Sequence, residues 1–165
     1  MPKNKDITYG SFVCDYRPLK SEPWRVWIVV GGDKLSYNSE TGSPAASLLE
    51  TKILLNSTIS DAHKGARFMS MDLKDFFLAT PMQHPEYMRV PIKFFPSDII
   101  RMYKLNDKIH NNNIYIKIKK GMYGLKQAAV LAYNNLVKKL AQFGYEPMEF
   151  TDSFWKHKTK PTKFC

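Results

Sequence analysis

Cysteine is almost absent from this chain, since only Cys14 and Cys165 occur among its 165 residues. They lie far apart and have no histidines at ligand spacing, so neither a disulfide framework nor a zinc site is supported, and two free thiols are expected. No apolar run approaches the roughly 20 residues that span a bilayer. The first six residues also lack the apolar centre of a signal peptide. We therefore expect an intracellular, soluble protein with no membrane partner.

Negative charge is also in short supply. The chain has 15 acidic residues against 25 lysines and arginines, which gives a formal net charge of +10. Such a surplus attracts polyanions, nucleic acid first and anionic membranes second, and the sign alone does not choose between them. Because 44% of the residues are hydrophobic, one domain with a sizeable core is expected, although two lobes that share a core would also fit.

Several stretches predict strands by their β-branched and aromatic content. They cover residues 11–14, residues 24–32, which end in a glycine turn, and residues 86–90 among a run of prolines. Residues 109–119 predict a hairpin that turns at three asparagines, and apolar and basic residues alternate after Tyr115. A short buried strand is expected at residues 66–73. Since side chains alternate along a strand, Asp72 would stand at its far end.

Helices are expected in three places. Ser43 as N-cap and Pro44 at the first helical position predict a long helix that runs to Gly65. A short helix capped by Ser97 is expected over residues 97–105. Residues 127–143 predict an amphipathic helix that stops at Gly144 and turns inward the side chains of Ala129, Val130, Tyr133, Leu136, Val137, Leu140 and Phe143. Helices and hairpins without strict βα alternation predict an α+β fold.

Asp72 is the first residue with a chemical interpretation. It lies in the segment Met-Asp-Leu-Lys-Asp-Phe-Phe at residues 71–77, at the predicted end of a strand and before a tight turn. A carboxylate in that place can hold a divalent cation, and Mg²⁺ prefers one or two carboxylates together with substrate phosphate oxygens. The alternative is an aspartate that caps the following turn.

Gly121 and Gly124 form a second candidate, between a basic strand and the predicted start of a helix. Two glycines let the backbone approach a ligand closely, and a helix N-terminus with Lys126 beside it suits a phosphate or a base pair. The alternative is an ordinary turn from strand to helix. The glycine pattern is not a phosphate-loop or dinucleotide fingerprint.

Basic and aromatic residues surround the predicted strand at residues 24–32. They are Arg17, Lys20, Arg25, Lys34, Trp24, Trp27 and Tyr37. Basic side chains interleaved with aromatic ones suit nucleic acid or a nucleotide, because the basic groups pair with phosphates and the rings stack on nucleobases. Basic residues scattered over a solvated face are the alternative.

Two segments, in this order, resemble the polymerase domain of copia-type retrotransposon reverse transcriptases. Met-Asp-Leu-Lys-Asp-Phe-Phe-Leu at residues 71–78 is similar to the family's Met-Asp-Val/Ile-Lys-x-x-Phe-Leu segment. Tyr-Gly-Leu-Lys-Gln at residues 123–127 matches a second family segment letter for letter. Val-Gly-Gly-Asp-Lys-Leu at residues 30–35 is typical of a subgroup. The resemblance runs from about residue 15 to the end of the chain.

The resemblance implies roles for individual residues. Asp72 would be the catalytic aspartate that binds both metal ions, Mg²⁺ or Mn²⁺, with the Leu73 carbonyl as a further ligand. Phe77 would be the gate beneath the incoming sugar, and Gln127 and Arg25 would border the nucleotide. Further nucleic-acid contacts are implied for Lys34, Tyr123, Gly124 and Lys126. The fold implied is a partial right-hand polymerase with an antiparallel sheet backed by two long helices, in which about residues 15–66 are mainly fingers and 67–165 mainly palm.

The sequence departs from the family in two respects. Trp27 stands where relatives usually carry a second basic residue. The family also needs a later hairpin with two adjacent aspartates, and no Asp-Asp pair occurs in these 165 residues. In the subgroup, a segment like residues 152–164 comes just before that hairpin. We therefore expect a truncated polymerase domain with an incomplete metal site, because two cations about 4 Å apart repel each other without enough negative charge to hold them.

Three functions follow as hypotheses. The first is a fragment of an RNA-directed DNA polymerase that is inactive alone, whose partners would be an RNA template, a DNA primer, a deoxynucleoside triphosphate and the rest of the polymerase and RNase H polyprotein. The second is a non-catalytic nucleic-acid-binding module derived from such a polymerase. The third is a small basic assembly protein with chance motif matches. A cytoplasmic or nuclear location, associated with particles in an active element, is expected for the first.

Overall fold

The computed structural model describes residues 5–149, 151 and 153–165. Asp152, which begins the segment compared with the subgroup, lies outside the described residues. The chain divides into two compact units. One combines Met1–Thr41 with Phe77–Ala128, and the other combines Gly42–Phe76 with Ala129–Cys165. The expected division into fingers and palm stays a prediction.

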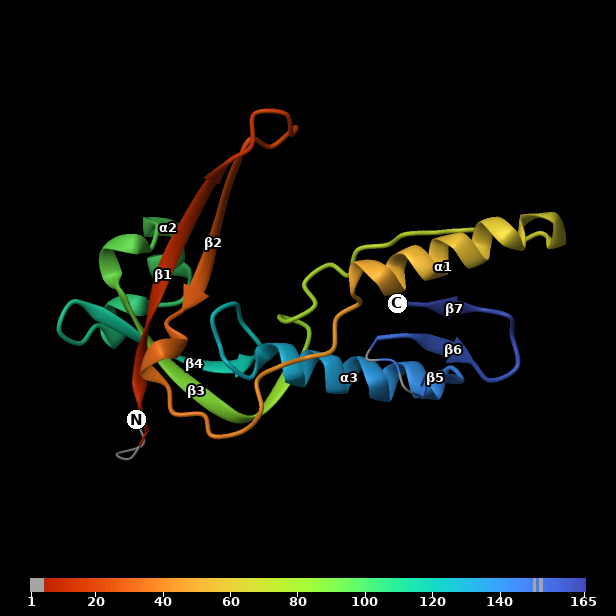
Figure 1. The fold of residues 1–165 in the computed structure, drawn as a ribbon. Helices are drawn as coiled ribbons and strands as arrows, with labels where there is room; N and C mark the ends of the chain where they lie inside the picture. The colour runs from red at the N-terminus through yellow and green to blue at the C-terminus, as the bar shows by residue number, and fades with distance from the viewer. Residues whose placement is uncertain (1–4, 150, 152) are drawn as a thin grey trace. The chain divides into compact units, whose positions relative to one another are not determined.

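The first unit is built on a four-stranded sheet (Figure 1), with strand order β2-β1-β3-β4. The strands are β1 (Ile7–Tyr16), β2 (Trp24–Val30), β3 (Pro81–Pro91) and β4 (Asn113–Lys120). The strands predicted at residues 11–14, 24–32 and 86–90 all form, and the α+β class is confirmed. The expectation of an antiparallel sheet is wrong because β1 and β3 pair in parallel, whereas β1 with β2 and β3 with β4 pair antiparallel.

One face of this sheet carries the core of the first unit. Its buried side chains alternate along the strands and include Thr8, Met88, Val90, Ile114 and Ile118. Phe12 and Phe95 are partly buried and pack against this core. The ring centroid of Phe12 lies 5.1 Å from that of Phe94 in the 3-10 helix η3 (Ile92–Phe94). Side chains at the alternating positions therefore project from the opposite face, as the pleat requires.

The hairpin predicted at residues 109–119 is wrong in its pairing. Asn111 and Asn112 do make a tight turn with positive φ values of 48° and 58°, a conformation that asparagine tolerates. However, only an isolated bridge joins His110 to Asn113 across it, and β4 pairs along its length with β3. The alternating isoleucines of β4 decide the outcome, because they share the core face with the apolar residues of β3.

The short helix α2 (Ser97–Met102) begins at the predicted residue but has Pro96, not Ser97, as its N-cap. It ends three residues before the predicted Leu105, since Lys104 adopts a left-handed conformation with φ 49°. The 3-10 helix η4 (Leu105–Lys108) follows and places Leu105 in a buried position. A left-handed residue cannot continue a right-handed helix, which explains the early end.

In the second unit, helix α1 (Leu48–Ser60) starts later than predicted because Ser47, not Ser43, is the N-cap. Ser47 Oγ accepts the Glu50 amide at 3.1 Å, and the Glu50 carboxylate accepts the Ser47 amide at 2.7 Å. This capping box satisfies two amides at once. These bonds, the backbone one first, lower the pKa of Glu50. No described residue of α1 is buried.

Helix α1 is followed by the 3-10 helix η2 (Ala62–Lys64), and Gly65 ends this helical stretch as predicted, in a left-handed conformation with φ 86°. A glycine at this place carries no penalty for that conformation.

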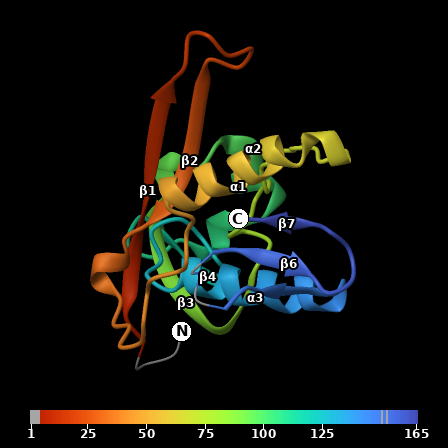
Figure 2. The same cartoon turned by 45° about the vertical axis from the view of Figure 1, so that its right-hand side comes forward.

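Helix α3 (Ala128–Gln142) confirms the helix predicted at residues 127–143 to within one residue at each end, and Gly144 follows it with φ 81°. Trp155 of a small sheet packs edge-on to Tyr133 of α3, so the sheet lies alongside the helix (Figures 1 and 2). The inward orientation predicted for Phe143 is wrong, because this side chain at the end of α3 is 71% exposed.

The small sheet consists of the antiparallel strands β5 (Tyr145–Pro147), β6 (Trp155–His157) and β7 (Lys163–Phe164). Trp155 is buried and stacks on Phe164 with ring centroids 5.8 Å apart. Two separate sheets therefore occur in the described residues, one in each unit, where the resemblance implied one antiparallel sheet.

The strand predicted at residues 66–73 is not formed, and Asp72 therefore does not end a strand. A strand exists through backbone hydrogen bonds to a neighbour, and no strand in the described part of the chain pairs with this segment. Its apolar side chains are open to solvent: Phe68, Met69, Met71 and Leu73 are between 48% and 73% exposed. Alternation alone cannot supply a strand with its partner.

Among the helices within the described ranges, none is both long and apolar enough to cross a membrane.

Candidate functional site

The segments at residues 30–35 and 123–127 meet through their backbones, and we call this contact the glycine junction. The Val30 amide donates to the Tyr123 carbonyl at 2.8 Å. A Cβ atom added to Gly32 would overlap the carbonyl oxygen of Gly124, and one added to Gly124 would overlap that of Val30. Gly124 also has a φ of 93°, in the left-handed region. Both glycines are thus required by close packing.

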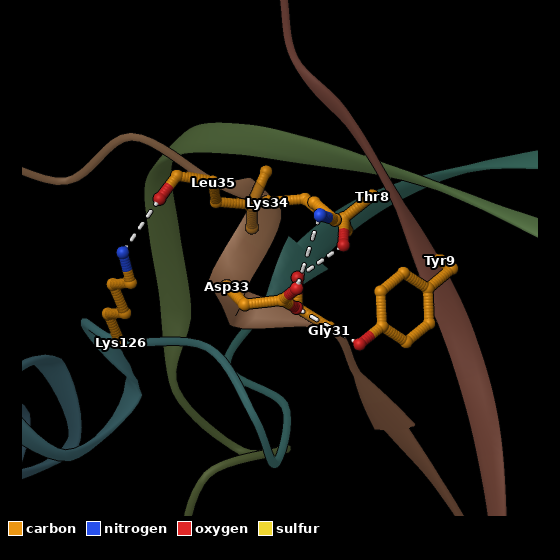
Figure 3. Close-up of polar contacts among 7 residues, drawn as sticks. All are labelled: Thr8, Tyr9, Gly31, Asp33, Lys34, Leu35 and Lys126. Carbon is orange, nitrogen blue, oxygen red and sulfur yellow. Dashed lines mark hydrogen bonds and ion pairs between the residues drawn. The ribbon is translucent and has the colours of Figure 1, made fainter.

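Lys126 ties the junction from its other side (Figure 3). Its ammonium group donates a 3.0 Å hydrogen bond to the carbonyl of Leu35. Leu35 and Leu125 are both buried in the core of the first unit. Lys126 was predicted to contact nucleic acid, and in this arrangement its charge is directed at a carbonyl of its own chain.

Polar contacts join the start of β1 to the backbone and side chains around the 3-10 helix η1 (Gly32–Lys34) (Figure 3). The Thr8 hydroxyl donates to the Gly31 carbonyl, and the Tyr9 hydroxyl donates to the Asp33 carboxylate at 3.0 Å. This hydrogen bond, and then the charge of Asp33, raise the pKa of Tyr9 above its ordinary value. The Lys34 ammonium lies 3.7 Å from the same carboxylate and is well exposed, so Lys34 remains accessible to a ligand.

Phe77 and Tyr123 form an aromatic contact beside the junction. Their rings meet edge to face with centroids 5.1 Å apart, and Tyr123 is 43% exposed. A Cβ atom on Gly121 would come within 2.8 Å of the Phe77 carbonyl oxygen, and the Gly121 amide donates to Thr80 at 2.9 Å. The backbone of residues 121–123 therefore fixes the position of Phe77, the residue predicted to be the sugar gate.

Gln127 lies directly before α3 and is buried, with 5% of its surface exposed. Its amide nitrogen donates to the Glu86 carboxylate on β3 at 3.2 Å. Its amide oxygen is buried as well, and among the described residues it has no hydrogen-bond partner. A buried amide oxygen without a donor is costly, so this side chain is poised to gain a donor.

Arg25 lies on β2, on the exposed part of the β1–β2 hairpin. Its guanidinium group stands over the ring of Trp27 at 5.1 Å from the centroid, and its backbone pairs with Asp15. A cation held over an aromatic face keeps its charge and its donors. Trp27 thus positions Arg25.

Asp72 and Leu73 belong to the second unit, and both are exposed. Within the described ranges, no group of three or more histidine, cysteine or acidic residues could hold a metal ion. The residues present supply an accessible carboxylate but not the full set of ligands for two metal ions. Asp75, three residues on, has a φ of 54° that marks the turn.

Of the predicted site residues, the first unit brings Lys34, Tyr123, Gly124, Lys126 and Gln127 into the junction or directly beside it, with Phe77 against Tyr123. Sequence reasoning gave no role at the site to Tyr9 or Glu86. In the sequence, Glu86 is a lone acidic residue in a predicted strand, and that pattern does not specify a hydrogen-bond partner such as Gln127.

Comparisons with protein-family models, with curated proteins and with solved structures gave no match to this chain.

Proposed function

We propose that this chain is the fingers and first palm part of an RNA-directed DNA polymerase of the copia-type retrotransposon class, within a right-hand polymerase fold. The intact protein would transfer nucleotides to a DNA primer on an RNA template. The isolated 165 residues would be inactive because they contain a single candidate for the catalytic carboxylates, Asp72.

The observation that carries this proposal is the glycine junction. The residues that resemble the family at positions 30–35 and 123–127 lie far apart in sequence, yet they contact each other through glycines that admit no side chain. Chance matches to short motifs have no reason to fold against each other. The resemblance therefore coincides with a shared structural requirement.

Each residue has a proposed task. The guanidinium of Arg25 is exposed and preoriented by Trp27, so it suits a triphosphate. Phe77 is held against Tyr123 and offers an apolar edge to a sugar. Gln127 has a buried amide oxygen that lacks a donor, which a nucleotide hydroxyl could supply after a side-chain rotation.

Asp72 and the Leu73 carbonyl would hold Mg²⁺ or Mn²⁺ in the intact protein. Bound metal ions would stabilise the attacking and leaving oxygens of the phosphoryl transfer. The contribution of Asp72 itself is an accessible negative charge on an exposed segment. Its carboxylate would be a ligand of the metal ions, with the nucleotide phosphates as additional ligands.

The proposal is tested by Mn²⁺-dependent binding of a deoxynucleoside triphosphate to the full chain. Asp72→Asn keeps the shape of the side chain and removes its charge, and we expect the affinity to fall about tenfold, equivalent to roughly 1.4 kcal/mol. Asp75→Asn is the matched control, because it removes the same charge three residues away and asparagine tolerates the positive φ at that site. Equal losses in the two variants would contradict a specific role for Asp72.

A non-catalytic nucleic-acid-binding module is the second candidate, favoured by the exposed cations and aromatic rings of the first unit. The same titration separates the two, because this module would bind no nucleotide in a metal-dependent way.

A further inference from the structure

The solvent side of the four-stranded sheet carries aromatic and basic side chains in alternation. Opposite the core residues, the register places Tyr9, Arg89 and Tyr115 side by side across β1, β3 and β4. The next row contains Ile7, Tyr87 and Lys117. Lys119 continues the same face along β4. We call this surface the tyrosine face.

The rows form a checkerboard. Arg89 has Tyr9 and Tyr115 as its cross-strand neighbours, and Tyr87 lies two positions before it on the same strand. Lys117 stands across from Tyr87 and two positions after Tyr115. Neighbouring strands are about 4.8 Å apart and alternate residues along a strand about 6.6 Å apart. Arg89 and Lys117 therefore each lie within side-chain reach of at least two tyrosine rings.

This face is available to a ligand, whereas the other face of the sheet is packed. Arg89, Lys117 and Lys119 are exposed, and Tyr87 and Tyr115 are half-buried, which leaves part of each ring open. His110 extends the aromatic row, with its ring 6.1 Å from that of Tyr115. At the opposite margin, the Asp33 carboxylate accepts a hydrogen bond from the Tyr9 hydroxyl and lies next to the Lys34 ammonium. These contacts partly offset its negative charge, which would otherwise repel a polyanion.

We propose that the tyrosine face binds single-stranded nucleic acid, with bases stacked on Tyr87 and Tyr115 and phosphates paired with Arg89 and Lys117. Aromatic rings stack on unpaired bases of any sequence, and basic side chains beside them neutralise the backbone. A duplex keeps its bases stacked on one another, so the rings would give a preference for single strands.

An anionic membrane is the other polyanion that the charge of +10 allows. Insertion into the lipid boundary requires an apolar patch, and in the two rows the only aliphatic side chain is Ile7. The alternation of ring and cation fits bases and phosphates better. The inference does not depend on metal binding at Asp72, which belongs to the other unit, so it holds even if the proposed polymerase function fails.

The test is fluorescence anisotropy of the full chain with a labelled 12-residue oligothymidylate, in parallel with a duplex of mixed sequence and vesicles of anionic lipid. Three double variants are compared: Tyr87→Leu with Tyr115→Leu, Tyr87→Phe with Tyr115→Phe, and Arg89→Gln with Lys117→Gln. The control is Lys138→Gln with Lys139→Gln, which removes two exposed charges from α3. Circular dichroism of each variant checks that it is folded.

We expect the leucine pair to weaken single-strand binding by about tenfold or more for each ring, as base stacking allows, and to change duplex binding little. The phenylalanine pair, which keeps both rings, should bind like the unaltered chain. Loss of Arg89 and Lys117 should make the slope of log affinity against log salt shallower by about 1.4, or 0.7 for each phosphate contact on a single strand.

Three results would overturn the inference. In the first, the leucine pair binds the oligothymidylate as tightly as the unaltered chain does. In the second, the α3 control lowers the affinity and the salt slope as much as the loss of Arg89 and Lys117. In the third, binding to anionic vesicles, but not to the oligonucleotide, depends on this face. Should the leucine pair fail to fold, the salt slope of the glutamine pair decides alone.

Discussion

The family resemblance rests on two regions with opposite structural characters, the glycine junction and the stretch around Asp72. The glycine junction, at residues 30–35 and 123–127, is closely packed, and its glycines leave no room for a side chain. The Asp72 segment, at residues 66–73, is exposed, forms no strand, and leaves apolar side chains in solvent. The junction is therefore specified by sterics inside this chain. The Asp72 segment carries an exposed carboxylate, and the described residues do not form a complete metal site around it.

This difference predicts where substitutions alter folding and where they alter ligand binding. Changes at the junction should appear in the free energy of unfolding, because packed interiors tolerate no added volume. Changes in the Asp72 segment should leave stability almost unaffected, since exposed residues without close partners contribute little.

The largest expected effect is that of Gly124→Ala. The new methyl group would overlap the Val30 carbonyl, and the left-handed φ adds backbone strain. We expect a loss of about 3 kcal/mol or more in the free energy of unfolding, measured by urea denaturation. Gly42→Ala is the control, since nothing lies within 4 Å of its added Cβ atom. Similar stability of both variants would show that the junction is not closely packed.

A smaller loss is expected for Lys126→Met, which keeps the length of the side chain. The variant removes the 3.0 Å hydrogen bond to the Leu35 carbonyl, and such bonds contribute about 1 kcal/mol. Lys138→Met removes an exposed charge of α3 and should change stability much less. If Lys126→Met cost nothing but weakened nucleic-acid binding, the lysine would serve the ligand and not the junction.

Asp72→Asn should change the free energy of unfolding by less than about 1 kcal/mol, because Asp72 is exposed. Thermal unfolding monitored by circular dichroism measures this directly. A destabilisation of several kcal/mol would identify Asp72 as a structural carboxylate, and the contrast between the two segments would fail.

The smallest effect concerns pH at the edge of the junction. The pKa of Tyr9 is raised in the folded chain from 10.0, chiefly by its hydrogen bond to Asp33. A group with a raised folded pKa contributes stability below its unfolded pKa and loses that contribution as the pH rises through the folded value. Stability should therefore fall more steeply above about pH 10 in the unaltered chain than in Tyr9→Phe, as urea denaturation between pH 8 and 11 would show. Parallel curves would contradict the coupling.

Local signals predicted several individual elements correctly. The strand at residues 24–32, the helix at 127–143 and the stop at Gly144 all follow from propensity and capping. The start of α1 was predicted four residues too early, at Ser43, although Ser47 and Glu50 have the spacing of a capping box.

Contacts between distant parts of the chain were beyond local reasoning. Neither the parallel pairing of β1 with β3 nor the approach of Gly32 to Gly124 has a signal within a short window. For the site, the sequence marked the residues of the junction but not that Lys126 and Gln127 bind Leu35 and Glu86 of their own chain. The strand expected at 66–73 failed for a related reason, since a strand depends on a partner that its own residues do not specify.

Primer extension tests the central claim most directly, that Asp72 is a catalytic carboxylate of a polymerase whose metal site these 165 residues do not complete. The purified chain should bind an RNA template annealed to a DNA primer at low salt, and binding should weaken steeply as salt rises, because counterion release drives it. It should incorporate no nucleotide. A longer protein that adds an Asp-Asp hairpin and the rest of the polymerase should extend the primer and lose this activity with Asp72→Asn. Incorporation by residues 1–165 alone, abolished by Asp72→Asn, would contradict the claim of an incomplete site, and extension by the longer protein that survives Asp72→Asn would contradict the role of Asp72.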